Sequence, residues 1–357
     1  MPMTPLKTVA TLSAPTLALS LLVGFSGSSV DKIAFTPAEG ATVTKTFSSL
    51  TELEVDDMSM LVNGEEPPIP PMTMTMSVTQ TLTVTDEYVA MGDGQPSKLA
   101  RTYDAVSSGL EVEFESVMGS GTPSGVGSSP LEGSTVHFTW DSDTESYEAA
   151  FAEGEEGEDE LLEGLEEDLD LRTLLPEEEL AEGDTYEIEV GAFADVIAAG
   201  GDLHLEIDVD GDMAGAGMDP EMMTDFRRFF DEMLEGDATG KYVGARDMDG
   251  IKVAVIEIEV ELNATADMSA LAAESMGEGL PDGASMQVNK LDVEMSYEGT
   301  GELHWNLAKG VIHGFSIEAQ MTMDTDMEVD AVMGGQETTI ASEIAVSGTV
   351  TNTVTTK

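Results

Sequence analysis

A two-residue alternation from Val311 to Ala331 constrains the fold of this chain more than any other feature of its sequence. One parity carries apolar side chains together with His313 and is broken only by Thr325, while the other parity is polar and mostly acidic. Side chains of a strand point alternately to opposite faces, so the run predicts one long strand with a dry face and an acidic face. The apolar members are Val311, Phe315, Ile317, Ala319, Met321, Met323, Met327, Val329 and Ala331.

The same alternation recurs along the chain and predicts a mainly β protein. It is clearest at residues 72–85, where Met, Val and Leu alternate with Thr and Ser, and at 254–262 and 291–297, where apolar residues alternate with acids. Long strands twist, so we expect a long curved antiparallel sheet, a half-barrel or open barrel, rather than a flat one. Further strands are expected near residues 41–55, 110–115, 136–140, 186–190, 203–209 and 344–354.

Two short helices and two connectors interrupt this pattern. Four leucines at helical spacing in an acidic stretch predict the first helix, over residues 161–169. The second is predicted over 219–234, where Asp219 suits the N-cap and Pro220 the first helical position. The Gly- and Ser-rich residues 119–130 are expected to form a flexible loop, and the proline-rich residues 63–71 a rigid connector.

The N-terminus has the features of a secretory signal. Lys7 precedes a short apolar stretch from Leu17 to Phe25, and small residues follow at 26–29. The stretch is too short to span a membrane, and an ordinary N-terminal strand is the competing interpretation. We therefore expect residues 1–29 to be a signal peptide and linker, and the protein to be secreted or periplasmic.

Residues 30–357 are expected to form a single large β domain. The Met- and Thr-rich strands near Met72 and Met321 echo one another, which leaves open two similar halves, residues 30–200 and 201–357.

The charge of the chain excludes some partners. There are 71 acidic and 14 basic residues, a net charge of −57. Such a charge repels nucleic acid and anionic membrane surfaces, and it favours cations and basic partners. No segment beyond the N-terminus is apolar enough to cross a membrane, so an integral membrane protein is not expected. The chain has no cysteine, which excludes disulfides, thiolate metal sites and cysteine nucleophiles.

Few side chains have metal-ligand spacing. Asp208, Asp210, Asp212 and Asp219 match four ligand positions of an EF-hand-like loop, so calcium is the one cofactor that the sequence suggests. The central glycine and the final glutamate of such a loop are missing, and an acidic turn is the competing interpretation. If a three-residue loop ends at Gly310, His313 faces Trp305 and not His304, which argues against a histidine metal pair.

The Met-rich dry faces are the most suggestive binding feature. Methionine offers soft, adaptable apolar surface that suits a lipid or acyl chain, although ordinary core filling is the competing interpretation. The candidate ligand-binding residues are Met72, Met74, Met76, Phe315, Met321 and Met323.

No nucleophile elbow, phosphate loop or dinucleotide motif occurs, so we do not expect an enzyme. The leading hypothesis is a secreted acidic β protein that binds or carries a hydrophobic small molecule or lipid. The alternative is a structural acidic envelope or surface protein that binds cations weakly. A hydrolase using paired carboxylates ranks last.

Three stretches carry a family resemblance: Leu174 to Val190, Ala238 to Leu262 and Thr300 to Val329. In the first stretch a proline is followed by Gly-Asp at the start of a strand. The second contains a strand with the pattern DGIKVAVI, and the third contains a GTGELHWNLAKG hairpin before a Met/Thr strand. In these motifs the chain resembles secreted, β-rich bacterial domains of unknown function, common in planctomycete-type genomes. The resemblance implies export and a fold akin to the curved sheets of periplasmic lipoprotein carriers. It transfers no catalytic residues, and the acidic inserts of this chain depart from the pattern.

Overall fold

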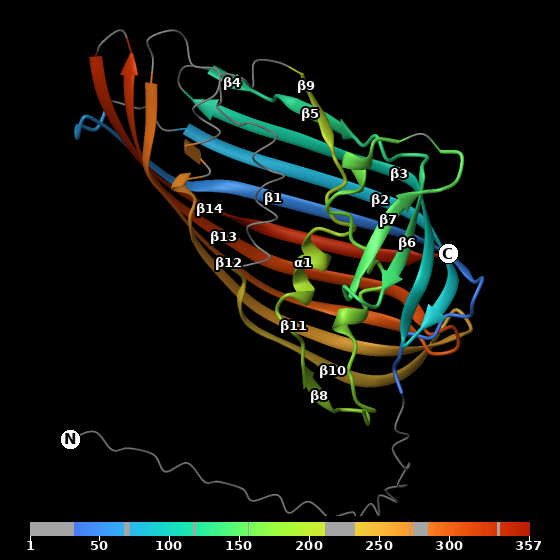
Figure 1. The fold of residues 1–357 in the computed structure, drawn as a ribbon. Helices are drawn as coiled ribbons and strands as arrows, with labels where there is room; N and C mark the ends of the chain where they lie inside the picture. The colour runs from blue at the N-terminus through green and yellow to red at the C-terminus, as the bar shows by residue number, and fades with distance from the viewer. Residues whose placement is uncertain are drawn as a thin grey trace, which may run out of the picture.

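A single curved antiparallel sheet dominates the computed structural model (Figure 1). The model describes residues 32–67, 72–116, 119–155, 157–210, 233–270, 272–273, 285–333 and 336–357. The strands follow the order β7-β6-β3-β2-β1-β14-β13-β12-β11-β10-β8. Among the described residues β7 and β8 pair with no further strand, so the sheet is open, as the sequence predicts.

The long strands form hairpin after hairpin, except that β1 pairs with β14 in the middle of the sheet. The first and last strands of the described residues therefore lie side by side. The predicted similarity of residues 30–200 and 201–357 stays a prediction. The long strands are β1 (Thr42–Val62), β2 (Met72–Gly92), β3 (Gln95–Ser116), β10 (Glu235–Met248), β11 (Ile251–Asp267), β12 (Ser285–Asn306), β13 (Val311–Met333) and β14 (Gln336–Thr356), and the shorter ones are β6 (Thr135–Asp141), β7 (Ser146–Phe151) and β8 (Thr185–Glu187).

Strand β13 confirms the alternation on which the prediction was based. Phe315, Ile317 and Ala319 are buried, while Ser316 and Glu318 between them are exposed. In the long strands the apolar parity lies on the concave face, and the polar parity, which is acidic in β11 and β13 and rich in Thr and Ser in β2 and β14, lies on the convex face. The same periodicity thus determines both the fold and the distribution of charge.

A segment of the chain itself covers one half of the concave face. We call residues 158–205 the filling segment; it lies within the curve of the sheet in Figure 1. It contains two short 3-10 helices, η1 (Asp159–Leu162) and η2 (Arg172–Leu174), and the helix α1 (Ala192–Ile197). Its apolar side chains join one core with those of the sheet, including Leu169, Leu171, Leu174, Phe193 and Val196.

The predicted helix over residues 161–169 is wrong. Leu161 and Leu162 belong to the 3-10 helix η1, and Leu165 forms an isolated bridge with Gly201. The leucines are spaced as in a helix, but an extended chain brings them to the core one after another. Helix α1 was not predicted, and the helix predicted over 219–234 lies almost entirely outside the described residues.

The Gly- and Ser-rich residues 119–130 are not a plain loop. They form β4 (Gly119–Gly121) and β5 (Ser124–Ser128), which pair with β3, and β5 also pairs with β9 (Glu206–Asp210). A Cβ on Gly127 would lie 2.0 Å from the Ser108 Oγ and 3.2 Å from Ile207. Glycine is present here because the neighbouring strands approach closely, not because the chain must be flexible.

The register of the β12–β13 hairpin differs from the predicted one. Trp305 faces Ile312 and Asn306 faces Val311, with a register shift next to His304. His313 is therefore not the partner of Trp305. The Trp305 ring is buried, and its Nε1 donates to the carbonyl of Ala34 at 3.1 Å.

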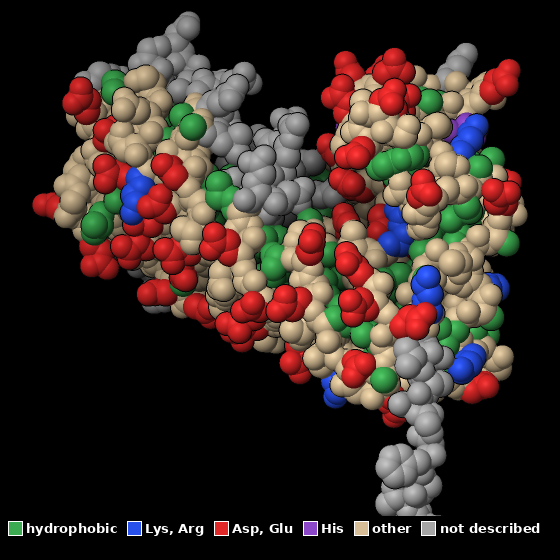
Figure 2. Space-filling model, turned by 60° about the horizontal axis from the view of Figure 1, so that its bottom comes forward, with side chains coloured by type: hydrophobic (Ala, Val, Ile, Leu, Met, Phe, Trp, Pro, Cys, Tyr) green, Lys and Arg blue, Asp and Glu red, His purple; other side chains and the backbone are tan. Residues whose placement is uncertain are grey.

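Carboxylates face one another across the convex side of the sheet. Glu261 stands opposite Glu298, and Glu257 opposite Glu302. Figure 2 shows Asp and Glu side chains over much of the face that it presents. Like charges directly opposite each other weaken a sheet, so these pairs oppose folding.

We predict that salt stabilises the protein. Raising NaCl from about 0.05 M to about 1 M shortens the Debye length from above 10 Å to about 3 Å and screens the facing carboxylates. The free energy of unfolding, measured with urea, is expected to rise. Glu298→Gln should stabilise by a few tenths of a kcal/mol at low salt and by nothing measurable at high salt. A free energy of unfolding that stays constant or falls with salt contradicts this account.

Candidate functional site

The concave face has two halves that differ in what covers them. The filling segment buries one half. In the other half, Met74, Met76 and Met323 are only partly buried and lie between two smaller buried clusters. What holds the filling segment in place therefore decides which part of the face it covers.

A buried charge cluster joins the filling segment to three neighbouring strands. We define it as Lys45 on β1, Asp86 and Tyr88 on β2, Arg101 on β3 and Asp170 in the filling segment. The Lys45 Nζ lies 2.9 Å from an Asp86 oxygen and 2.7 Å from an Asp170 oxygen. The Tyr88 hydroxyl donates to the Asp170 carboxylate at 2.7 Å. All five side chains are buried, so each charge depends on the others for its hydrogen bonds.

Arg101 connects the sheet directly to the backbone of the filling segment. Its Nε and Nη2 donate to the two Asp86 oxygens at 2.8 and 2.9 Å, a bidentate pair. Nη1 and Nη2 donate to the carbonyls of Glu166 and Glu167, each at 2.8 Å. The guanidinium thus supplies a donor to the Glu166 carbonyl and a second donor to the Glu167 carbonyl, which also accepts from the Leu169 N–H at 2.9 Å.

A second set of charges continues the cluster within the filling segment. Arg172 forms ion pairs with Glu167 and Asp168, and its guanidinium lies over the ring of Phe35, 5.0 Å from the centroid. The Phe35 ring in turn contacts Tyr88 and Trp305. The described N-terminal residues are therefore held between the sheet and the filling segment.

The cluster shifts the pKa values of its members in opposite directions. Burial alone would raise the pKa of Asp86, but Arg101 and Lys45 beside it lower that pKa to about 2. Burial raises the pKa of Asp170, although Lys45 opposes the rise. Burial also raises the pKa of Glu167 to about 7, against the pull of Arg172. Asp86 is thus firmly ionised at neutral pH, whereas Glu167 titrates there.

The half of the concave face that the filling segment does not cover is lined mainly by methionine among the described residues. We name it the methionine floor. Met76 on β2, Leu53 on β1, Gly348 on β14 and Met321 on β13 lie in one row across the sheet. The floor comprises Val55, Met58, Met74, Met76, Met321, Met323, Met327, Ile344 and Val346.

The floor lies between two buried clusters. On the β2–β3 side, Met74 and Met76 pack against the buried Leu110 and Val112. On the β11–β12 side, Met323 and Met327 pack against a cluster that includes Leu291. Between these borders the floor extends about 20 Å along β13 and about 14 Å across the strands from β2 to β13, by ordinary strand dimensions.

The predicted ligand-binding residues fall into separate places. Met74, Met76, Met321 and Met323 lie together on the floor and are half-buried. Phe315 is buried in the filled half, apart from these four methionines, and its role in ligand binding stays a prediction. The side chain of Met72 lies outside the described part of the structure.

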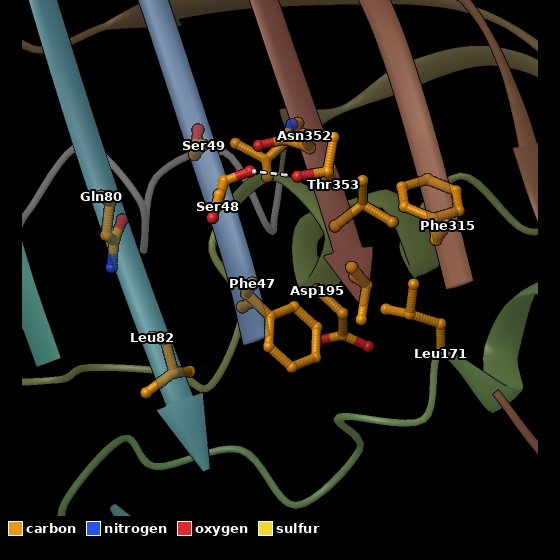
Figure 3. Close-up of a pocket in the computed structure, with 14 residues that line it drawn as sticks. Phe47, Ser48, Ser49, Gln80, Leu82, Leu171, Asp195, Phe315, Asn352 and Thr353 are labelled. Atoms are coloured by element: carbon orange, nitrogen blue, oxygen red, sulfur yellow. Dashed lines mark hydrogen bonds between the residues drawn. The ribbon is translucent and has the colours of Figure 1, made fainter. Parts of the chain in front are cut away.

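A small cavity lies beneath the filling segment (Figure 3). Its volume is about 30 Å³, enough for a water molecule or two but not for a lipid chain. Phe47, Leu171, Asp195 and Phe315 line it together with Asn352. Among the described methionines of the floor, Met76, Met321 and Met323 do not line it. The filled half is therefore a packed core and not an acyl-chain pocket.

Of the four predicted calcium ligands, only Asp208 has a side chain in the described part of the structure. Asp208 is exposed on β9, while the side chain of Asp210 and residues Asp212 and Asp219 lie outside the described part. The site stays a prediction. Within the described ranges no three His, Asp or Glu side chains gather as a metal site.

Comparison with known proteins adds little to this geometry. No protein-family model and no curated protein matches the chain. The crystal structure of the outer membrane protein OprG from Pseudomonas aeruginosa matches 88% of this chain and 97% of that chain, at 10% identity and a TM-score of 0.21. A TM-score this low carries no argument about fold or function. The resemblance to secreted planctomycete-type domains stays a prediction. In the part of the chain that the structure describes, no helix has the length and apolar character needed to cross a membrane.

The sequence contains a signal for the charge cluster that our prediction missed. Lys45 shares the buried parity of Val43 and Phe47, Asp86 that of Val84 and Tyr88, and Arg101 that of Leu99 and Tyr103. A charge on the dry parity of a strand must be paired when the sheet is covered. Three such positions on successive strands indicate a shared buried network.

We predict that Lys45→Met destabilises the protein by about 3–5 kcal/mol, because it leaves Asp86 and Asp170 buried with one cation fewer. Urea unfolding at neutral pH measures the change. Lys252→Met serves as the matched control, since Lys252 is an exposed lysine on β11 and its loss should change the free energy of unfolding by less than about 0.5 kcal/mol. Equal effects of the two substitutions contradict a structural role for the cluster.

We also predict that Glu167 makes the stability fall as pH rises from about 5 to about 7.5. The folded state keeps the Glu167 proton up to a pKa of about 7, whereas the ordinary value is 4.5. Because the folded state then binds more protons than the unfolded chain, stability decreases through this window, by up to about 3 kcal/mol. Glu167→Gln, which resembles the protonated form, should remove this part of the slope.

The control for that experiment is Glu328→Gln, which removes an exposed carboxylate from β13. The slope between pH 5 and 7.5 should remain close to that of the unchanged protein. If the pH dependence of Glu167→Gln runs parallel to that of the unchanged protein, the raised pKa of Glu167 is wrong.

Proposed function

We propose that the protein is a non-enzymatic binding or carrier module that holds a lipid-like apolar ligand on the methionine floor. One observation supports this above the others. The two halves of one continuous concave face differ in burial: the filled half has buried Phe47, Leu82 and Phe315, and the other half has methionines that are only partly buried.

The chemistry of the floor suits such a ligand. Methionine side chains are flexible and polarisable, so they adapt to chains of varying shape. The floor is about 20 Å long, and one leaflet of a bilayer, half of its hydrocarbon core, is about 15 Å thick. An acyl chain of ordinary length therefore fits along β13. Burying each methylene group contributes about 0.8 kcal/mol.

The proposal includes export to a secreted or periplasmic location. The N-terminal signal features and the family resemblance support it, and the fold of a curved open sheet agrees with the fold that the resemblance implies. A binding module for lipid-like molecules is of use where such molecules cross an aqueous space.

A structural acidic surface protein is the second candidate. The exposed carboxylate pairs on the convex face, such as Glu261 with Glu298, favour it. The small size of the cavity in the filled half also agrees with a protein that encloses no ligand. The two candidates differ in one measurable property, the binding of an apolar chain in the concave face.

We predict that delipidated protein binds dodecyl maltoside below its micelle concentration, and that Met323→Glu weakens this binding at least about tenfold. A carboxylate on the floor must lose its hydration when the chain binds, and 1.4 kcal/mol of that cost is already tenfold in affinity. Isothermal titration calorimetry measures the affinity.

Thr322→Glu is the matched control, because it adds the same charge to the same strand on the exposed face. Its affinity should match that of the unchanged protein within about twofold. No binding of dodecyl maltoside by the unchanged protein rules out the carrier function and leaves the structural candidate. Equal weakening by both substitutions shows that any binding takes place elsewhere.

A further inference from the structure

We infer that the methionine floor prefers apolar chains whose polar end is neutral or cationic, and that it binds fatty acids and anionic phospholipids more weakly. The inference rests on the proposed function and adds the charge class of the ligand. It is drawn from the charges on the strands that make up the floor.

Those strands carry almost only negative charge at this end of the sheet. In residues 53–62, 74–76, 286–297, 321–329 and 340–348 there are nine Asp or Glu side chains and one basic side chain, Lys290. In Figure 2, Lys and Arg gather towards one end of the face that is presented, while Asp and Glu cover both ends. The basic side chains are therefore unevenly placed, with only Lys290 in these residue ranges at the end of the sheet that carries the floor.

The one basic side chain is already paired. The Lys290 Nζ lies 3.3 Å from an Asp292 oxygen and forms a second ion pair with Asp326. An anionic ligand would have to compete with two carboxylates of the protein for this ammonium group. Lys290 therefore offers no counter-charge for a carboxylate or phosphate.

The basic side chains of the buried charge cluster are no more accessible. Lys45 and Arg101 are fully buried, and each is bound to carboxylates or carbonyls in the filled half. Arg172 is likewise paired with Glu167 and Asp168. None of the three faces the floor.

The acidic side chains lie close behind the floor. On β13, Met323 and Met327 alternate with Asp324, Asp326 and Glu328. Successive side chains of a strand point to opposite faces, so only the backbone of the sheet separates these acids from the floor. The carboxylates are thus roughly 10 Å or less from a bound chain, within about one Debye length at 0.1 M salt.

The acidic residues of β13 also face further acids. Asp324 stands opposite Glu294, and Asp326 opposite both Asp292 and Glu343. This concentration of like charge makes the local potential strongly negative. It raises the cost of bringing a second carboxylate to the floor and attracts an ammonium group.

The test compares three amphiphiles with the same fourteen-carbon chain: myristate, tetradecyl maltoside and tetradecyltrimethylammonium. Affinities are measured at pH 8 in about 20 mM and about 500 mM NaCl, below each micelle concentration. We expect the cationic amphiphile to bind at least about tenfold more tightly than myristate at low salt, with the maltoside between them. The difference should shrink to about threefold or less at high salt.

Two variants show where the selectivity arises. Asp324→Asn with Asp326→Asn should reduce the low-salt ratio between the cationic and the anionic amphiphile by at least about threefold. Glu257→Gln with Glu302→Gln removes two facing carboxylates at the other end of the sheet and should leave the ratio nearly unchanged. Competition with tetradecyl maltoside confirms that the cationic amphiphile occupies the floor.

Myristate that binds as tightly as the maltoside at low salt overturns the inference but leaves the proposed function standing. The same holds if the two double variants reduce the ratio equally. If none of the three amphiphiles binds, the proposed function and this inference both fail.

Discussion

The buried ion pairs of Lys45 with Asp86 and Asp170, together with those of Arg101, determine how the rest of the molecule is arranged. Three adjacent strands each supply a charged or polar side chain, and the filling segment supplies Asp170 and two backbone carbonyls. Buried ion pairs seldom add much net stability, because desolvation cancels most of the Coulomb attraction. Their effect is specific: few other placements of the filling segment satisfy all of these groups. The division of the concave face into a half that the filling segment covers and a half that it does not cover follows from this one arrangement.

The alternation in β13 links that arrangement to the proposed function. Its apolar parity runs from Phe315 in the filled half to Met321, Met323 and Met327 on the methionine floor, and its acidic parity runs along the convex face behind them. One strand therefore provides both the surface for an apolar chain and the negative potential that sorts the polar ends of such chains. The facing carboxylates reduce the stability of the sheet at low salt, and the packed core of the filled half has to offset that cost.

The sequence predicts the sheet well and the site only in part. A period of two over twenty residues is hard to produce in any fold but a long strand, so β13, β11 and β2 follow from local pattern alone. The spacing of Leu161, Leu162, Leu165 and Leu169 predicts a helix, but it cannot distinguish an amphipathic helix from an extended chain that meets the core repeatedly. The contact of Lys45 with Asp170 joins residues far apart in the sequence, and periodicity does not indicate such partners. Met74 and Met323 could be named as ligand-binding candidates, but only the position of the filling segment separates them from Phe315.

We propose above all that the methionine floor, the half of the concave face that the filling segment does not cover, binds an apolar chain. Methyl NMR of protein labelled with ¹³C at its methionine methyl groups tests it most directly. On titration with dodecyl maltoside, the account predicts shifts of the methyl signals of Met74, Met76, Met321 and Met323. The signal of Met91, which packs against the core of the filled half, should stay unchanged. Shifts spread evenly over all methionines, or no shift at the four floor residues, would contradict the account.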